Sequence, residues 1–163
     1  HKKTEFLRLI REMLPFIEEV AIEKFMDMSL FLKLKETYSS GKYIPASMIS
    51  DGTINILALI IALYFEKRPV TVIEEPERNI HPFLISQLVE MLKDAARTKQ
   101  IIVTTHNPEM VKHADLEDIL LISRDRSGFS QVIRPGTKKE IRTFLEHEIG
   151  IEDLFIQNLL GME

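Results

Sequence analysis

Two adjacent carboxylates follow a short apolar segment and define the first candidate site. Glu74 and Glu75 come directly after Val70–Ile73, whose residues are all apolar or β-branched, and Pro76 ends the run. This segment is typical of a buried strand, so the chain places two acidic groups side by side at a strand end. Because successive strand residues point to opposite sides, the two carboxylates can serve different tasks.

A histidine follows the next apolar segment. Gln100–Thr105 predicts a second buried strand, and His106 comes immediately after it. Between the two strands, residues 82–98 have apolar side chains at helical spacing. Strands that alternate with helices indicate an α/β fold, mainly a parallel sheet that helices cover on both faces. Ligands bind at the carboxyl ends of such strands. If the two strands are neighbours, the two glutamates and His106 converge on one crevice.

A polar segment opens an almost wholly apolar helix that precedes both strands. Ser50, Asp51 and Gly52 come before this helix, which we expect at 54–65. Serine is a preferred N-cap residue, and a capped helix N-terminus is also an anion site. The sequence therefore predicts a capped helix start that can bind an anion.

The three motifs together resemble a known family. In chain order "ISDGT", "VIEEPE" and "TTHNP" resemble the signature, Walker B and switch-histidine motifs of ABC-type ATPases, a group of P-loop NTPases. The sequence Glu-Arg-Asn-Ile-His-Pro after the acid pair resembles soluble ATPases related to SMC and RecF-like proteins. That group includes the ATPase components of phage-defence and toxin–antitoxin systems. The resemblance covers a motif core at about 47–134.

The resemblance implies a role for the acid pair and the histidine in hydrolysing ATP. Glu74 stands where the family usually has the magnesium-associated aspartate, and it is one methylene longer. Glu75 matches the catalytic glutamate, and His106 matches the histidine that contacts the γ-phosphate. ATP and Mg²⁺ are the cofactors that the resemblance implies.

The resemblance also implies a dimer. Ser50, Asp51 and Gly52 match the signature, which in this family reaches across a homodimer to the ATP held by the other subunit. Asp51 departs from the glycine of transporter signatures. Because its charge would repel phosphate, it should turn away or hold neighbouring backbone N–H groups. Asn79 to His81 falls where the family has its dimer-facing loop, although His81 before Pro82 reads most simply as a helix cap. Nucleic acid or a nuclease or toxin partner is a further expectation, because DNA repair, phage defence and toxin regulation all use such heads.

A phosphate-binding loop is missing from the sequence. No segment matches G-x-x-x-x-G-K-[ST], because the only Gly-Lys pair, Gly41-Lys42, has Glu36 and Tyr43 at the other motif positions. We therefore expect the C-terminal half of an ABC-type head, with the Walker A strand, its helix and the Q-loop upstream. A start at His1 without an initiator Met agrees with this. Alone, such a chain should bind ATP poorly.

The composition suits one soluble domain, expected over 1–163. Of 163 residues 45% are hydrophobic, the net charge is −4, and there is no cysteine for a disulfide or a Cys-based zinc site. The longest apolar run, 56–65, is too short to span a bilayer, so we expect a cytoplasmic protein without a membrane partner. The pattern predicts further elements: a helix at 4–14, a β-hairpin at 18–26 and 29–37, a strand pair at 118–123 and 129–133, and C-terminal helices within 137–161 (138–147 and 152–160).

Two alternatives from other classes stay open. One is a non-catalytic interaction lobe with a decayed ATPase site, and an upstream glycine-rich P-loop would argue against it. The other is a metal-dependent hydrolase that uses Glu74, Glu75 and His106. The sequence has no HExxH and no further acid cluster of the D-x-D type, and metal binding without nucleotide would support this second alternative.

Overall fold

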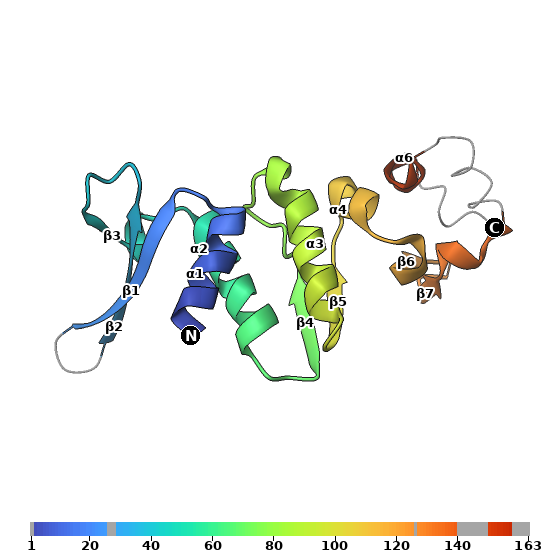
Figure 1. Ribbon diagram of the computed structural model, residues 1–163. Coiled ribbons are helices and arrows are strands. Elements are labelled where there is room, and N and C mark those ends of the chain that lie inside the picture. Colours follow the sequence, from blue (N-terminus) through green and yellow to red (C-terminus); the bar gives the residue numbers. More distant parts are fainter. Residues whose placement is uncertain (1, 26–28, 126, 140–149, 158–163) are drawn as a thin grey trace. The chain divides into compact units, whose positions relative to one another are not determined.

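The computed structural model describes residues 2–25, 29–125, 127–139 and 150–157 (Figure 1). The chain forms two compact units, 1–105 and 106–163. Within them lie one parallel and several antiparallel strand pairs with helices between them, so the predicted α/β class is confirmed. The single domain expected from the sequence stays a prediction.

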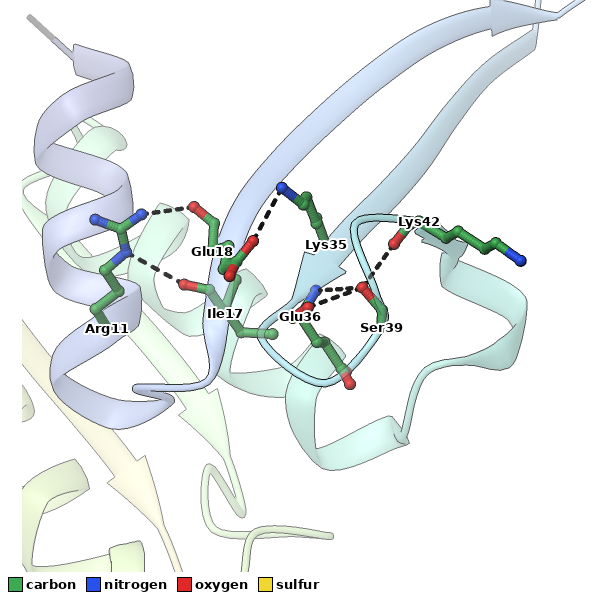
Figure 2. Close-up of polar contacts among 7 residues, drawn as sticks. All are labelled: Arg11, Ile17, Glu18, Lys35, Glu36, Ser39 and Lys42. Atoms are coloured by element: carbon green, nitrogen blue, oxygen red, sulfur yellow. Dashed lines mark hydrogen bonds and ion pairs between the residues drawn. The ribbon is translucent and has the colours of Figure 1, made fainter.

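Helix α1, Lys2–Met13, packs its apolar side on the first unit and holds the following strand. Its buried residues are Leu9, Ile10 and Met13. Near its C-terminus, the Arg11 guanidinium donates to the carbonyl oxygens of Ile17 at 3.2 Å and Glu18 at 2.6 Å (Figure 2). The arginine therefore satisfies two carbonyls where the chain leaves the helix and enters the sheet.

The predicted hairpin is confirmed. Strand β1, Ile17–Phe25, pairs antiparallel with β2, Ser29–Glu36, and buried Val20 faces buried Leu34 across the pair. The turn expected near Asp27-Met28 lies outside the described residues. A short strand that we did not predict, β3 (Tyr43–Pro45), adds to the free edge of β2.

The Gly-Lys pair lies in the tight turn between β2 and β3. The Ser39 hydroxyl lies 2.8 Å from the Glu36 carbonyl oxygen and 2.7 Å from that of Lys42, which closes the turn (Figure 2). Gly41 takes a φ of 80°, which suits a glycine. This strand-to-strand turn differs from the strand-to-helix loop that a phosphate site needs.

The apolar helix predicted at 54–65 starts earlier and changes its winding. Helix α2 covers Asp51–Ile60 and continues as the π-helix η3, Ile61–Phe65. The Lys99 ammonium donates to the carbonyl oxygens of Ala62 at 3.1 Å and Glu66 at 2.9 Å. A cation thus satisfies carbonyls at this helix end, where the negative end of the dipole favours it.

The two predicted buried strands are neighbours in a parallel pair. Strand β4, Val70–Glu74, lies beside β5, Gln100–Thr104, and the connection is the short helix η4, Pro82–Leu84, followed by α3, Ile85–Ala96. Helix α3 buries its apolar side, made of Ile85, Leu88, Val89, Met91, Leu92 and Ala95.

The coverage of this sheet differs from the expectation of helices on both faces. The residues Thr71, Ile73, Ile101 and Val103 on one face are partly buried. On the other face Val70 and Ile102 are each 44% exposed and Val72 is 64% exposed. Helix α3 packs against β5, and among the described residues no element buries the opposite face. A parallel strand pair is normally buried on both faces, so this apolar face is unusual.

The second unit contains α4 (Pro108–His113), the 3₁₀ helix η5 (Leu116–Asp118), the antiparallel strands β6 (Leu121–Arg124) and β7 (Ser130–Ile133), and α6 (Ile151–Ile156). The strand pair was predicted, but β6 starts later because η5 takes residue 118. Val111, Ile151 and Leu154 form its small core. Most of the helix expected at 138–147 lies outside the described residues. In the described part of the chain, no helix is long and apolar enough to cross a membrane.

Candidate functional site

The acid pair lies at the carboxyl end of β4, beside the end of β5. Glu74 is the last residue of β4, is exposed, and is the register partner of Thr104. The next amide continues the ladder, because the Glu75 N–H donates to the Thr104 carbonyl oxygen at 2.9 Å. The predicted pairing of the two strands therefore puts both glutamates at the edge where parallel sheets bind ligands.

Glu75 has an unusual backbone. Its φ is 44°, in the left-handed region that residues other than glycine rarely adopt. Its carbonyl oxygen accepts from the Arg78 N–H at 2.9 Å, so both the amide and the carbonyl group of Glu75 are hydrogen-bonded. Strained residues of this kind persist only where surrounding contacts fix them, and they gather at functional sites. No local sequence signal predicts this conformation for a glutamate.

The start of α2 packs onto the loop that follows the acid pair. Ser50 caps the helix as predicted, because its hydroxyl accepts from the Thr53 N–H at 3.2 Å. The Asn55 side-chain amide donates to the Arg78 carbonyl oxygen at 2.9 Å. The cap and the loop therefore belong to one small structure within the first unit.

Gly52 allows this close approach. A Cβ at position 52 would lie 2.2 Å from the Asn79 backbone oxygen, which is far inside any van der Waals contact. Asn79 itself has a φ of 61°. The structure thus brings the segment Ser50–Gly52, with exposed Asp51, against the loop at 79–81, two motifs that lie far apart in the sequence.

The histidines divide between the two units. His81 caps η4, because its Nδ1 accepts from the Phe83 N–H at 3.2 Å, and the simple reading of this residue is confirmed. His106 is exposed and opens the second unit, directly after Thr105. Asn107 then caps α4 as the sequence indicates, accepting from the Glu109 N–H at 2.9 Å. Convergence of His106 with the glutamates stays a prediction.

Sequence reasoning missed Glu77, which is one of two polar or charged residues buried in the described chain. Its Oε1 accepts a hydrogen bond from the Thr105 hydroxyl. The sequence "EEPERN" contains three glutamates within four positions, and nothing in the pattern says which of them turns inward. Among the described residues, no three His, Asp or Glu side chains gather into a group that could hold a metal ion by themselves.

A family model matches residues 2–112, which include all three motifs, and its description is "AAA domain, putative AbiEii toxin, Type IV TA system". The chain belongs to this family. Membership supports an ATPase-type function and the use of a nucleotide. It also agrees with the resemblance to SMC and RecF-like ATPases. No curated protein matches the sequence.

Solved structures of SMC ATPase heads share the fold. A chain from a study of "ATP-driven dimerization and DNA stimulated activation of SMC ATPases" is 18% identical with a TM-score of 0.63, over 91% of this chain and 94% of that one. The Smc head of Pyrococcus furiosus bound to the C-terminal domain of ScpA is 18% identical with a TM-score of 0.67, over 90% of this chain and 37% of that one. The Thermotoga maritima SMC head is 17% identical with a TM-score of 0.55, over 81% of this chain and 46% of that one. At these identities the likeness shows the fold, and this chain spans less than half the length of the last two heads.

Proposed function

We propose that this chain is the C-terminal part of an ABC-type ATPase head that binds and hydrolyses ATP once its N-terminal part is present. The observation that carries the proposal is the placing of Glu74 and Glu75. They stand at the carboxyl end of a parallel strand pair, with the second held in a strained backbone. The order of the motifs and the family membership support the same reaction.

The residues present suit Mg²⁺ and ATP. Carboxylate oxygens are the ligands that Mg²⁺ prefers, and an exposed Glu74 at a strand end can reach a hydrated ion. When bound, Mg²⁺ would neutralise charge on the phosphates. In this proposal Glu75 accepts a proton from the attacking water, and His106 donates a hydrogen bond to the γ-phosphate. The capped N-terminus that follows Ser50 offers backbone N–H groups to a phosphate.

The uncovered face of β4 and β5 supports an additional N-terminal part. Val70, Val72 and Ile102 leave an apolar surface on a strand pair of a kind that is normally buried. We propose that the part carrying the P-loop covers this face and continues the sheet. Val72→Lys should then destabilise the full-length protein, while Ile22→Lys, at a 67% exposed position on the hairpin, should change stability little. Equal effects of the two variants on thermal unfolding would contradict the proposed coverage.

Dimerisation is the second part of the proposal. The family resemblance puts the signature of one subunit on the nucleotide of the other, and one matched SMC structure concerns ATP-driven dimerisation. We propose a homodimer with two ATP molecules in its interface. Work by this dimer on nucleic acid, or on a nuclease or toxin partner, is a proposal that rests on the family alone. Without cysteine, the chain suits the reducing cytoplasm, where we expect it to act.

The decisive experiment measures ATP binding and turnover separately in the full-length protein. Glu75→Gln keeps the shape of the side chain but removes the base, so turnover should fall by about 10²–10⁴-fold while ATP still binds. The matched control is Glu90→Gln, because Glu90 lies exposed on α3 and contacts Lys93 at 3.9 Å. Normal turnover in Glu75→Gln would remove Glu75 from the role of base. Absence of turnover in the unmodified protein would overturn the proposed function.

A further inference from the structure

Glu77 is a buried carboxyl group that the proposed reaction does not use. It lies two residues after Glu75, and only 7% of its surface is exposed. Its Oε1 accepts from the Thr105 hydroxyl, and its Oε2 has no hydrogen-bond partner among the described residues. Burying a carboxyl group with one oxygen unpaired is unfavourable, so a structure that keeps it there needs a compensating reason.

Glu77 lies in the turn at residues 75–80, which hydrogen bonds close internally and also tie to the end of β5. The turn leaves β4 at Glu75 and is closed by two backbone bonds, Arg78 N–H to the Glu75 oxygen at 2.9 Å and Ile80 N–H to the Glu77 oxygen at 3.0 Å. The end of β5 holds the same turn at two points. Thr104 accepts from the Glu75 amide at 2.9 Å, and Thr105 donates to the Glu77 carboxyl group.

The bonds from Thr104 and Thr105 hold Glu75 in a backbone conformation that it would otherwise leave. A left-handed backbone is unfavourable at a residue other than glycine. Relaxation of Glu75 out of that conformation would rotate its side chain away from its present place. Of the two bonds from the end of β5, the one from Thr104 holds the amide of Glu75. The one from Thr105 holds Glu77, and so fixes the part of the turn that follows Glu75.

We propose that Glu77 is a positioning residue, which through its hydrogen bond to Thr105 fixes the turn that carries Glu75 and so keeps the catalytic carboxylate in place. The inference rests on the proposed function and deepens it. Glu77 touches neither water nor nucleotide in this scheme. Its effect is on the rate of hydrolysis, since displacing a catalytic group by about 1 Å can lower a rate by roughly 10²-fold.

The first experiment measures kcat and KM for Mg²⁺–ATP in the full-length protein. Thr105→Val removes the donor while keeping the shape, and kcat should fall by about 10-fold or more with little change in KM, because the affected group acts on the attacking water. Thr105→Ser restores a donor and should recover most of kcat. The matched control is Thr98→Val, whose hydroxyl donates to the Ala95 carbonyl oxygen at 3.2 Å near the end of α3.

A second variant guards against loss of folding. Thr105→Val alone leaves the buried Glu77 without its donor, which destabilises the protein. The double variant Glu77→Met with Thr105→Val replaces both partners by apolar groups of similar shape, a change that can be nearly neutral for stability. It should fold and still show the lowered kcat. A double variant that folds and keeps normal kcat would overturn the inference.

The second experiment measures hydrogen exchange, which reports on the turn without any turnover. Amide exchange at Glu75 and Arg78 should be faster in Thr105→Val than in the unmodified protein and in Thr98→Val. Unchanged exchange there, or an equal loss of kcat in Thr105→Ser and Thr105→Val, would overturn the positioning role. Failure of the proposed function looks different, because then the unmodified protein does not hydrolyse ATP or Glu75→Gln hydrolyses it normally.

Discussion

Gly52 and Asn79 are in backbone contact although 26 positions separate them in the sequence. An added Cβ on Gly52 would lie 2.2 Å from the Asn79 carbonyl oxygen and 3.3 Å from its carbonyl carbon. The atoms that a side chain would meet are main-chain atoms, which cannot rotate away as a flexible side chain can. The glycine of the "SDG" segment is therefore required by its own subunit, independently of any role at a dimer interface.

We predict that Gly52→Ala destabilises the protein. In an ordinary helix position the change from glycine to alanine stabilises the protein by about 1 kcal/mol. At position 52, helix propensity therefore predicts a gain in stability, whereas the contact with Asn79 predicts a loss. Overpacking against the Asn79 backbone should prevail and lower the free energy of unfolding by about 1–3 kcal/mol. Urea denaturation measures this, and an increase in stability would show that the loop moves aside freely.

A comparison of glycine with alanine at position 75 tests the strained backbone. Both changes delete the side chain, but only glycine tolerates the φ of 44° without penalty. We predict that Glu75→Gly is more stable than Glu75→Ala by about 1 kcal/mol, and that neither variant hydrolyses ATP. At Ala58 on exposed α2 surface, a change to glycine should instead destabilise by about 1 kcal/mol. If alanine is the more stable residue at both positions, the backbone of Glu75 is not strained in solution.

The elements that the sequence predicted well are those whose apolar residues follow a regular period. The strand Val70–Ile73, the strand Gln100–Thr105 and the helix between them emerged with nearly correct bounds. The structure pairs the two strands in parallel across this helix, as short apolar strands joined by a helix usually do. The acid pair was then placed at the correct edge of the sheet.

What the sequence did not predict depends on contacts between distant segments. The conformation of Glu75, the burial of Glu77 and the contact between Gly52 and Asn79 have no local pattern. Strand β3 was missed because three residues are too few to show alternation. Coverage of the sheet on both faces was expected because parallel sheets normally have it, and the described part of this chain does not supply the second layer.

Tyr64 should titrate at strongly alkaline pH. Burial, with the carboxylate of Asp94 nearby, raises the pKa of Tyr64 from 10.0 to about 12. Its hydroxyl lies 3.2 Å from Asp94 Oδ2 and 3.3 Å from the Met91 carbonyl oxygen, so the neutral phenol has acceptors that phenolate would repel. The unfolded chain loses this proton first, so its contribution to stability is complete below pH 10 and is lost between pH 10 and about 12.

Tyr64→Phe provides the measurement. Subtracting its tyrosinate absorbance from that of the unmodified protein isolates the titration of Tyr64 from those of the other tyrosines. The variant should also lower stability at neutral pH by about 0.5–1.5 kcal/mol, because it loses a hydrogen bond. A difference titration with a midpoint at the ordinary tyrosine pKa would contradict the burial of this hydroxyl.

Mixing two inactive full-length proteins tests whether the signature acts in trans. Ser50→Arg puts bulk at the helix start, where we propose that the subunits meet, and should leave ATP binding by the open monomer nearly unchanged. The second protein carries a substitution that disables the lysine of the P-loop that we propose for the N-terminal part. In their heterodimer one composite site bears both lesions and the other bears neither, so turnover should return on mixing. A mixture that forms heterodimers and stays inactive would show that the signature acts within its own subunit or that both sites must act together.

The two-stranded sheet has a consequence for inhibitor design. Among the described residues β4 pairs only with β5, so each strand has one edge whose N–H and C=O groups lack a ladder partner. Such edges accept an added strand from another chain. A short extended peptide with apolar residues at alternate positions could therefore bind along β4 or β5. Under the proposed function, this peptide would compete with the N-terminal part for the edge of the sheet. It would then prevent assembly of the head without having to compete with ATP.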